Sequence, residues 1–179
     1  MSKARSAYKG KYASRYKYVK KVRSEAHAFS RRFDWANING NAGYIPFTNA
    51  STFTFNQLPN IGDFISLFDR YKITYIKLYI WLKIDPSAQT AATASYPKLY
   101  WVKDYDDAST PATLNEIREH QSCKVAVMHP NRPIVIRLKP STLSLTYRSA
   151  LASTYTPRWN QWVDMANTDV PHYGLKLAI

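Results

Sequence analysis

Apolar and polar residues alternate with a period of two over much of the chain. The clearest run is Tyr71–Ile84, in which the even positions from Ile76 onward are aliphatic and the odd positions are aromatic or basic. Such a period places successive side chains on opposite faces of a strand. The run therefore predicts a strand with an aliphatic inner face and a Tyr/Lys/Trp outer face. Its fourteen residues exceed the common strand length of about five or six.

The same alternation predicts further strands along the chain. They are Ala26–Trp35, Ser51–Asn56, Lys98–Tyr105, Cys123–Met128, Ile134–Lys139, Tyr173–Ile179 and, more weakly, Thr156–Met165. In Tyr173–Ile179 the leucines and Ile179 share one face, and Lys176 lies on the other. Prolines fall in the gaps between these segments, as loops between strands require.

Two short helices are predicted between the strands. Asn60 precedes Ile61–Asp69, whose apolar residues recur with helical spacing. Thr113 and Glu116 have the spacing of a capping box at the start of the second helix. Both helices are too short to serve as the crossovers of a parallel sheet. Seven or eight strands with two loop helices predict an all-β, antiparallel sandwich or barrel.

Positive charge is concentrated at the N-terminus. The 179 residues carry 25 Lys and Arg against 12 Asp and Glu, a formal net charge of +13. Residues 1–23 contain no acid and nine cations: Lys3, Arg5, Lys9, Lys11, Arg15, Lys17, Lys20, Lys21 and Arg23. A like-charged block with almost no aliphatic residues repels itself and cannot bury a core. We therefore expect residues 1–23 to form a disordered arm and residues 24–179 to form one folded domain.

Tyrosines are interleaved with the cations of this arm, namely Tyr8, Tyr12, Tyr16 and Tyr18. Cations release counterions from phosphates, and aromatic rings stack on unpaired bases, so the arm predicts contact with single-stranded nucleic acid. Arg31 and Arg32 adjoin the arm and extend this predicted contact. A purely solubilising tail and a lipid-binding tail are alternatives; the lack of acids speaks against the first, and the lack of an apolar face against the second. The basic run Lys17–Arg23 also fits a nuclear localisation signal.

The sequence carries no constellation typical of an enzyme or a cofactor site. A single cysteine, Cys123, excludes an intrachain disulfide and a Cys-rich zinc site. No H-E-x-x-H, G-x-S-x-G or glycine-rich nucleotide-binding loop is present. We therefore expect neither catalysis nor a metal or organic cofactor. No apolar run of about 18 residues and no signal-peptide core occurs, so we expect no membrane insertion.

Two groups of residues in the body have more than one interpretation. Asp104, Asp106 and Asp107 form either a divalent-cation site, a polar loop or a contact with a basic neighbouring subunit. Lys77 and Lys83 share a strand face with Tyr79 and Trp81. That face either meets DNA, packs against a neighbouring subunit or is an ordinary surface with lysines lying over aromatic rings.

Several motifs together resemble a known family. They are the basic Arg/Lys/Tyr arm, FNQLPNIGDFISLFDRYKI at Phe55–Ile73, YWVKDYDD at Tyr100–Asp107 followed by Pro111, and HYGL at His172–Leu175 after Trp159–Trp162. In this combination the chain resembles the capsid proteins of circovirus-like viruses, which have circular single-stranded DNA and encode a replication initiator. The resemblance covers most of the chain, and Leu67–Ile84 is its most specific stretch.

The resemblance implies a fold, an assembly and a location. Members of the family fold as an eight-stranded jelly roll, and sixty copies form a small icosahedral shell, the virion. Their basic arm faces the packaged single-stranded DNA and carries the nuclear localisation signal. By this resemblance, the cations and tyrosines of residues 3–23 contact DNA and are recognised by the host nuclear import machinery, and the protein is expected in the nucleus during assembly.

One departure from the family concerns the last strand. In similar capsid proteins the His-Tyr-Gly-Leu strand is usually followed by one more long strand, whereas this sequence stops at Ile179. Either that strand is absent or the sequence is a fragment of a longer one. If the strand is absent, we expect an exposed edge in one sheet.

A second function class also fits the composition. A cellular single-stranded nucleic-acid-binding β-barrel, of the type with an oligonucleotide-binding fold and a basic tail, would have a similar number of strands. The aliphatic inner face of Tyr71–Ile84 and the lack of an obvious basic groove in the body argue against this alternative. Particle formation discriminates between the two, because a capsid subunit forms closed particles of uniform size.

Overall fold

The computed structural model describes residues 26–37, 47–83, 96–149 and 152–179. The chain divides into two units, residues 1–31 and residues 32–179. The predicted arm, residues 1–23, lies outside the described residues, so its disorder and its boundary with the folded domain stay predictions. Within the second unit, the described residues form ten strands, two short α-helices and one turn of 3-10 helix.

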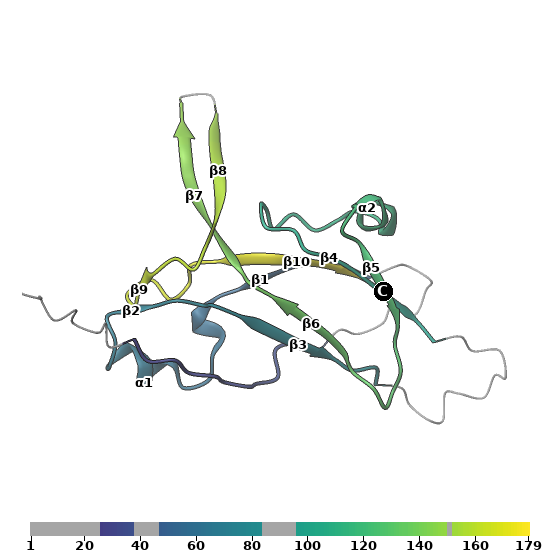
Figure 1. Ribbon diagram of the computed structural model, residues 1–179, viewed down its shortest axis with the longest axis horizontal. Coiled ribbons are helices and arrows are strands. Elements are labelled where there is room, and N and C mark those ends of the chain that lie inside the picture. The colour runs from purple at the N-terminus through teal and green to yellow at the C-terminus, as the bar shows by residue number, and fades with distance from the viewer. Residues whose placement is uncertain (1–25, 38–46, 84–95, 150–151) are drawn as a thin grey trace, which may run out of the picture. The chain divides into compact units, whose positions relative to one another are not determined.

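All strand pairings in the described residues are antiparallel (Figure 1). The larger sheet contains β1 (Thr48–Phe53), β4 (Lys98–Val102), β5 (Lys124–Val127), β7 (Ser141–Arg148), β8 (Ser153–Trp159) and β10 (His172–Ala178). Two smaller sheets pair β2 (Arg70–Tyr71) with β9 (Val163–Asp164), and β3 (Ile76–Ile80) with β6 (Ile134–Leu138). The helices are η1 (Phe55–Gln57), α1 (Ile61–Ile65) and α2 (Leu114–Glu119).

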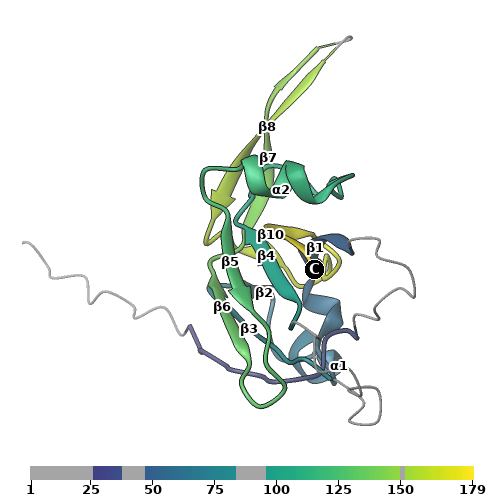
Figure 2. The same cartoon turned by 90° about the vertical axis from the view of Figure 1, so that its right-hand side faces the viewer.

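Strand β10 lies in the middle of the larger sheet. It pairs with β1 on one side and with β4 and β7 on the other. Leu175 and Leu177 of β10 pack with Leu99 of β4 against Ile136 and Leu138 of β6. The larger sheet and the β3–β6 pair thus form two layers around one core (Figure 2). The predicted all-β, antiparallel jelly-roll sandwich is confirmed, with ten described strands in place of the expected eight.

The predicted alternation of β3 is confirmed, but the predicted long strand is not continuous. Ile76, Leu78 and Ile80 are half-buried against the core, and Lys77 and Tyr79 between them are exposed. Residues 72–75 belong to no strand, because the segment before them pairs with β9 and the segment after them pairs with β6. One periodic run of sequence therefore serves two different sheets.

Other strand predictions need correction. The strand predicted at Ala26–Trp35 is wrong, since residues 26–37 form no strand although their sequence alternates. Strand β7 was not predicted at all, and β8 begins and ends earlier than the predicted Thr156–Met165. A strand needs an edge with which to pair, and a one-strand pattern carries no information about that edge.

Lys176 is not on an exposed face, contrary to the sequence interpretation of the β10 segment. It is only 8% exposed. The second face of β10 is covered too, because Ile117 of α2 packs against Val102 and Ala178 in a separate cluster. Strand β10 is therefore buried on both faces, which the simple rule of one inner and one outer face does not predict.

Both predicted helices are confirmed, and both are shorter or capped differently than expected. Asn60 precedes α1 with a left-handed φ of 58° and makes no side-chain cap. At α2 the Thr113 hydroxyl accepts a hydrogen bond from the Glu116 amide. The Glu116 carboxylate accepts from the Ala112 amide, one residue before the position that a regular capping box uses.

Gly174 lies where β10 passes under the loop after β4, and its φ of +152° is rarely adopted by other residues. A β-carbon there would lie 3.0 Å from Tyr105 Cε1 and 3.1 Å from Leu138 Cδ1. We expect Gly174→Ala to lower the free energy of unfolding by about 2 kcal/mol, through backbone strain and crowding. Gly62→Ala in α1 is the matched control, because nothing lies within 4 Å of its added methyl group. Denaturant unfolding checks both; equal stabilities would contradict the prediction.

Candidate nucleic-acid interface

The outer surface of the β3–β6 pair carries cations on both strands. Register places Lys77 of β3 opposite Arg137 of β6, and Tyr79 opposite Val135. Lys77, Arg137 and Tyr79 are all exposed. Like charges directly across an antiparallel pair are destabilising. The fold therefore tolerates an unfavourable pair at this position, and a bound polyanion would relieve it.

Tyr79 is at the centre of this charge. The Lys77 ammonium lies 4.7 Å from the centroid of its ring, and the Arg32 guanidinium carbon lies 5.2 Å from it. A hydrogen bond from Lys77, followed by the charges of Lys77, Arg32 and Arg137, holds the pKa of the Tyr79 hydroxyl below its usual value. Three cations thus converge on one exposed ring.

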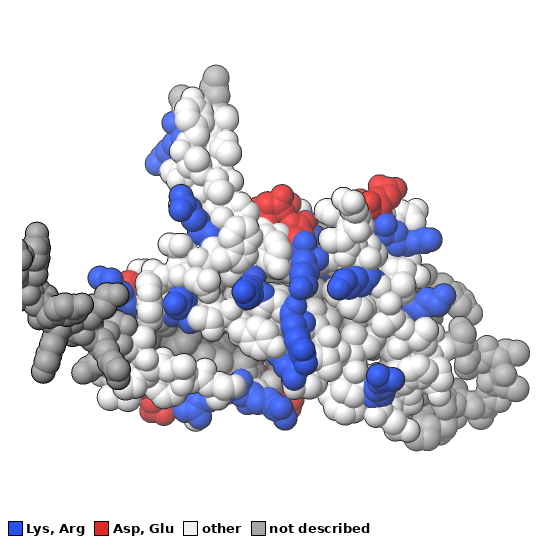
Figure 3. Space-filling model, in the orientation of Figure 1, with Lys and Arg blue, Asp and Glu red and all other residues white. Residues whose placement is uncertain are grey.

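Two more aromatic residues, one just before β3 and one just after it, continue the exposed odd-numbered positions of Lys77 and Tyr79. Tyr75 is 51% exposed and Trp81 is 53% exposed. We name the set Arg32, Tyr75, Lys77, Tyr79, Trp81 and Arg137 the basic-aromatic face. Exposed rings beside cations are the pattern that binds single strands without sequence preference, through stacking on bases and charge on phosphates. Figure 3 shows that Lys and Arg side chains lie widely over the side of the molecule in view.

The structure describes two of the predicted nucleic-acid-binding residues. Arg32 joins the basic-aromatic face, and Arg31 is exposed. The other thirteen, the arm cations Lys3 to Arg23 and the four arm tyrosines, lie outside the described residues and stay predictions. Lys83, the other basic residue of the Tyr/Lys/Trp outer face, is exposed as expected.

Arg137 was missed by the sequence analysis. The alternation of Ile134, Ile136 and Leu138 does place it on the outer face of its own strand. Its proximity to Lys77 and Tyr79 depends on the pairing of β3 with β6 and on their register, and neither is visible in one strand's pattern.

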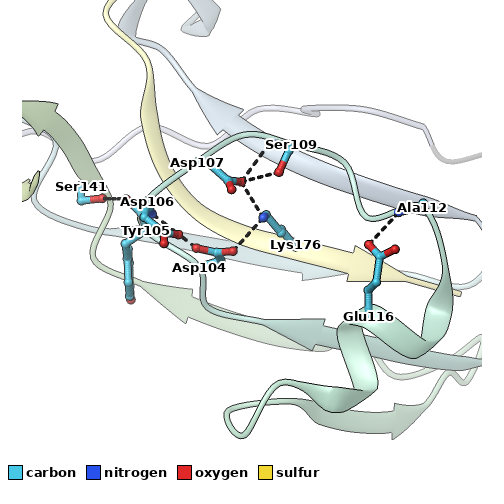
Figure 4. Close-up of polar contacts among 9 residues, drawn as sticks. All are labelled: Asp104, Tyr105, Asp106, Asp107, Ser109, Ala112, Glu116, Ser141 and Lys176. Atoms are coloured by element: carbon cyan, nitrogen blue, oxygen red, sulfur yellow. Dashed lines mark hydrogen bonds and ion pairs between the residues drawn. The ribbon is translucent and has the colours of Figure 1, made fainter. Parts of the chain in front are cut away.

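The aspartate group is occupied by a side chain of the protein itself (Figure 4). The Lys176 ammonium lies 2.7 Å from Asp104 Oδ2 and 2.5 Å from Asp107 Oδ1. Among the described residues, Asp104, Asp106 and Asp107 bring their carboxylates within 4.8 Å of one another. A buried lysine already supplies the positive charge that this carboxylate group needs, so the arrangement is an internal ion-pair cluster.

The pKa values in this cluster shift in opposite directions. Burial raises the pKa of Asp104, but hydrogen bonds from Asp106 and Lys176 and the lysine charge outweigh it, and the net pKa lies below its usual value. Sharing a hydrogen bond with Asp104 raises the pKa of Asp106. Burial lowers the pKa of Lys176, but its bonds to Asp104 and Asp107 raise it overall. The charged forms of Lys176, Asp104 and Asp107 therefore stabilise one another.

His172 and Cys123 have the burial and backbone contacts of structural residues. His172 is 2% exposed, with its Nδ1 2.9 Å from the Val170 carbonyl oxygen, and burial lowers its pKa. Cys123 is partly buried, and its amide donates to the His120 carbonyl in the turn between α2 and β5. Within the described ranges, no helix is long and apolar enough to span a membrane.

Comparison with known proteins decides the family. A family model described as circovirus capsid protein matches residues 4–179. The chain belongs to this family. It is accordingly a structural capsid subunit of a virion, and family membership argues against both the cellular binding module and an enzyme.

Other comparisons add little to the family assignment. No curated protein matches. Among solved structures, the crystal structure of the 60-mer BFDV capsid protein is similar, with 15% sequence identity and a TM-score of 0.48. The match covers 80% of this chain and 77% of that chain.

Proposed function

We propose that this circovirus-family capsid subunit assembles with copies of itself into a closed icosahedral shell and packages circular single-stranded DNA. The observation that carries the DNA-binding part is the opposition of Lys77 and Arg137 beside Tyr79, because this like-charged pair gains stability from a polyanion. The basic arm adds nine cations per copy. Sixty copies would carry roughly 540 arm cations, enough to neutralise a few hundred phosphates.

The proposed binding mode is tolerant of sequence. The arm supplies charge, and the exposed rings Tyr79 and Trp81 supply stacking surfaces that any base can use. A polyanion that binds several arms also brings several subunits together, so DNA favours assembly. The proposed localisation follows: the virion, and the host nucleus during assembly, with Lys17–Arg23 as the import signal.

Electron microscopy of the purified full chain tests the proposal, with ultraviolet absorbance recorded before and after nuclease. Uniform closed particles whose nucleic-acid absorbance survives nuclease are expected. A protein that binds DNA but stays monomeric at every concentration and salt condition would contradict assembly. Particles without protected nucleic acid, formed in the presence of single-stranded DNA, would contradict packaging.

The basic-aromatic face gives a separate prediction. We expect Lys77→Ala/Tyr79→Ala to weaken binding of a labelled single-stranded oligonucleotide by about tenfold, because one phosphate contact and one stacking surface are lost. The same variant should unfold at an equal or higher temperature, since the repulsion between Lys77 and Arg137 is removed. Fluorescence anisotropy and thermal unfolding measure the two effects.

Tyr96→Ala/Lys98→Ala is the matched control for this face. It removes one exposed tyrosine and one exposed lysine from a different part of the surface, at β4. Its affinity should stay within about twofold of the unchanged protein. Equal losses of oligonucleotide affinity in both double variants would show that only total charge matters and that the basic-aromatic face has no special role.

A further inference from the structure

Among the described residues, none covers the outer part of the hairpin formed by β7 and β8. At its base Ser141 and Thr142 are buried, but Leu145 to Arg148 are exposed, as is all of β8 except Pro157. Figures 1 and 2 show the two strands leaving the sandwich and extending away from it. A two-stranded hairpin alone is marginally stable in water. Its outer half therefore gains stability from a partner.

One face of this hairpin is apolar. Register pairs Leu143 with Pro157 and Leu145 with Tyr155, and Trp159 follows on the same side. Leu145 is 48% exposed, Tyr155 is 55% exposed and Trp159 is 47% exposed. The opposite side carries hydroxyls together with Tyr147 and Arg158, which pair with Thr154 and Thr142. The Thr146 and Thr156 hydroxyl oxygens on this side lie 2.6 Å apart. We name the side that carries Leu143, Leu145, Tyr155, Pro157 and Trp159 the hairpin apolar face.

The exposed area of this face is suited to a subunit contact. The exposed fractions of Leu145, Tyr155 and Trp159 correspond to roughly 300 Å² of largely apolar surface. A standard interface buries about 800 Å² per partner, of which somewhat more than half is apolar. The hairpin apolar face alone supplies most of that apolar share.

Charge indicates which surface faces the hairpin. Residues 141–162 contain Arg148 and Arg158 and no acid. Residues 104–119 hold five acids, Asp104, Asp106, Asp107, Glu116 and Glu119, against one cation, Arg118. Lys176 pairs with Asp104 and Asp107, so the negative charge available to another copy comes from Asp106, Glu116 and Glu119. Figure 3 shows acidic side chains over the loop after β4 and over α2, and basic but no acidic ones on the described part of the hairpin. In a chain of net charge +13, this acid-rich segment is the surface best suited to receive arginines from another copy.

The acidic segment also has an apolar neighbour. Val125 and Val127 of β5 are 55% and 42% exposed. Val125 is paired with Tyr100, which packs in the cluster beneath α2, so both valines lie on the α2 side of the sheet. We name Glu116, Glu119, Val125 and Val127 the α2–β5 surface. It combines the apolar and acidic groups that complement the hairpin.

We propose that the hairpin apolar face docks on the α2–β5 surface of a second copy of this chain. Each copy then gives one hairpin and receives one, and head-to-tail contacts of this kind generate closed rings when their rotation closes. The inference rests on the proposed function, because an assembling subunit always has further copies beside it.

Substitutions on the apolar face test the docking in the full chain. Leu145→Ser/Tyr155→Ser should abolish particles at concentrations where the unchanged protein assembles, as seen by light scattering and electron microscopy. Both side chains are half exposed, so the unfolding temperature should fall by no more than a few degrees. Ser144→Ala/Thr154→Ala, on the hydroxyl side, is the matched control and should assemble normally.

A charge exchange tests which surface receives the hairpin. Arg148→Glu alone and Glu119→Arg alone should each raise the concentration needed for assembly by about tenfold, through like-charge contact between copies. The combined variant Arg148→Glu/Glu119→Arg should return it to within about threefold of the original. If the combined variant instead needs a still higher concentration for assembly than either single variant, the proposed pairing of Arg148 with Glu119 is overturned.

The outcomes separate this inference from the proposed function. An unchanged chain that never forms particles contradicts both. Particles that survive Leu145→Ser/Tyr155→Ser contradict the docking alone. Loss of particles in that variant, with unchanged oligonucleotide affinity, supports the docking and shows that assembly rather than DNA binding was affected.

Discussion

Deletion of residues 1–23 is expected to lower the affinity for single-stranded DNA by about a thousandfold or more at low salt. The reason is the loss of nine cations with no compensating loss of acids. Each phosphate contact to a single strand releases counterions and contributes about 0.7 to the salt slope, so nine contacts give a slope near −6. After deletion, only the body's cations, Arg32, Lys77 and Arg137 among them, sustain the salt dependence. Anisotropy titrations with a labelled oligonucleotide, repeated from about 50 to 200 mM NaCl, measure both quantities.

Two further arm variants separate charge from stacking. Replacing the nine arm cations by glutamine should reproduce the flattened salt slope of the deletion. Replacing Tyr8, Tyr12, Tyr16 and Tyr18 by alanine should weaken binding while leaving the slope unchanged, because rings do not release counterions. A deletion that leaves the affinity unchanged would refute the role of the arm. A deletion that lowers the unfolding temperature would instead show that the folded domain starts before residue 24.

The parts of the fold that could be predicted are those set by local pattern. The alternation of Ile76, Leu78 and Ile80 correctly predicted their inward side because one strand with one buried face carries its own signature. Helix α2 was predicted for a similar reason, since Thr113 and Glu116 act within one turn. The family resemblance, which rests on several motifs with Leu67–Ile84 as the most specific, implied the jelly-roll fold that no local pattern contains.

The predictions that failed concern residues whose contacts come from segments distant in the sequence. The alternation of β10 predicts that Lys176 points outward, yet α2 and the loop after β4 cover it. Asp104 and Asp107 pair with its charge. The break at residues 72–75 arises because β2 and β3 pair with different strands. The basic-aromatic face was half predicted: Lys77, Tyr79 and Trp81 share one strand pattern, whereas Arg32 and Arg137 reach Tyr79 only through the fold.

These two charged regions differ in how their charges are satisfied. Lys176 is buried and has carboxylate partners in its own chain, so its charge contributes to stability of the subunit. Lys77 is exposed and faces another cation across the strand pair, so its charge lowers the stability of the isolated subunit. A cation without an acid partner beside exposed rings is what a nucleic-acid contact requires, and a cation enclosed by carboxylates is not.

Lys176→Met is expected to lower the free energy of unfolding by about 3 kcal/mol at neutral pH. The side chains of Lys176 and Asp104 are each only 10% exposed, so removal of the ammonium leaves a buried carboxylate without its counter-charge. Asp107 is 51% exposed and can be solvated instead, which limits its share of the loss. Denaturant unfolding of the full chain measures the change. Asp107→Asn is the graded control, with an expected cost below about 1 kcal/mol.

Acidification should reduce the loss of unfolding free energy that Lys176→Met causes. In the unchanged protein the pKa of Asp104 is below its usual value of 3.8, so its contribution to stability is present above that value and is lost as the pH falls through the lower, folded-state pKa. In the variant, burial without the lysine raises the pKa of Asp104, so protonation relieves the buried charge as the pH falls. The variant's gain begins above pH 3.8 and the loss in the unchanged protein occurs below it. Both trends narrow the difference in unfolding free energy between the two proteins as the pH falls, which a steric effect of methionine alone would not do. Lys176→Met/Asp104→Asn should likewise recover most of the loss at neutral pH, and a double variant no more stable than Lys176→Met would show that the lysine acts through packing rather than through charge.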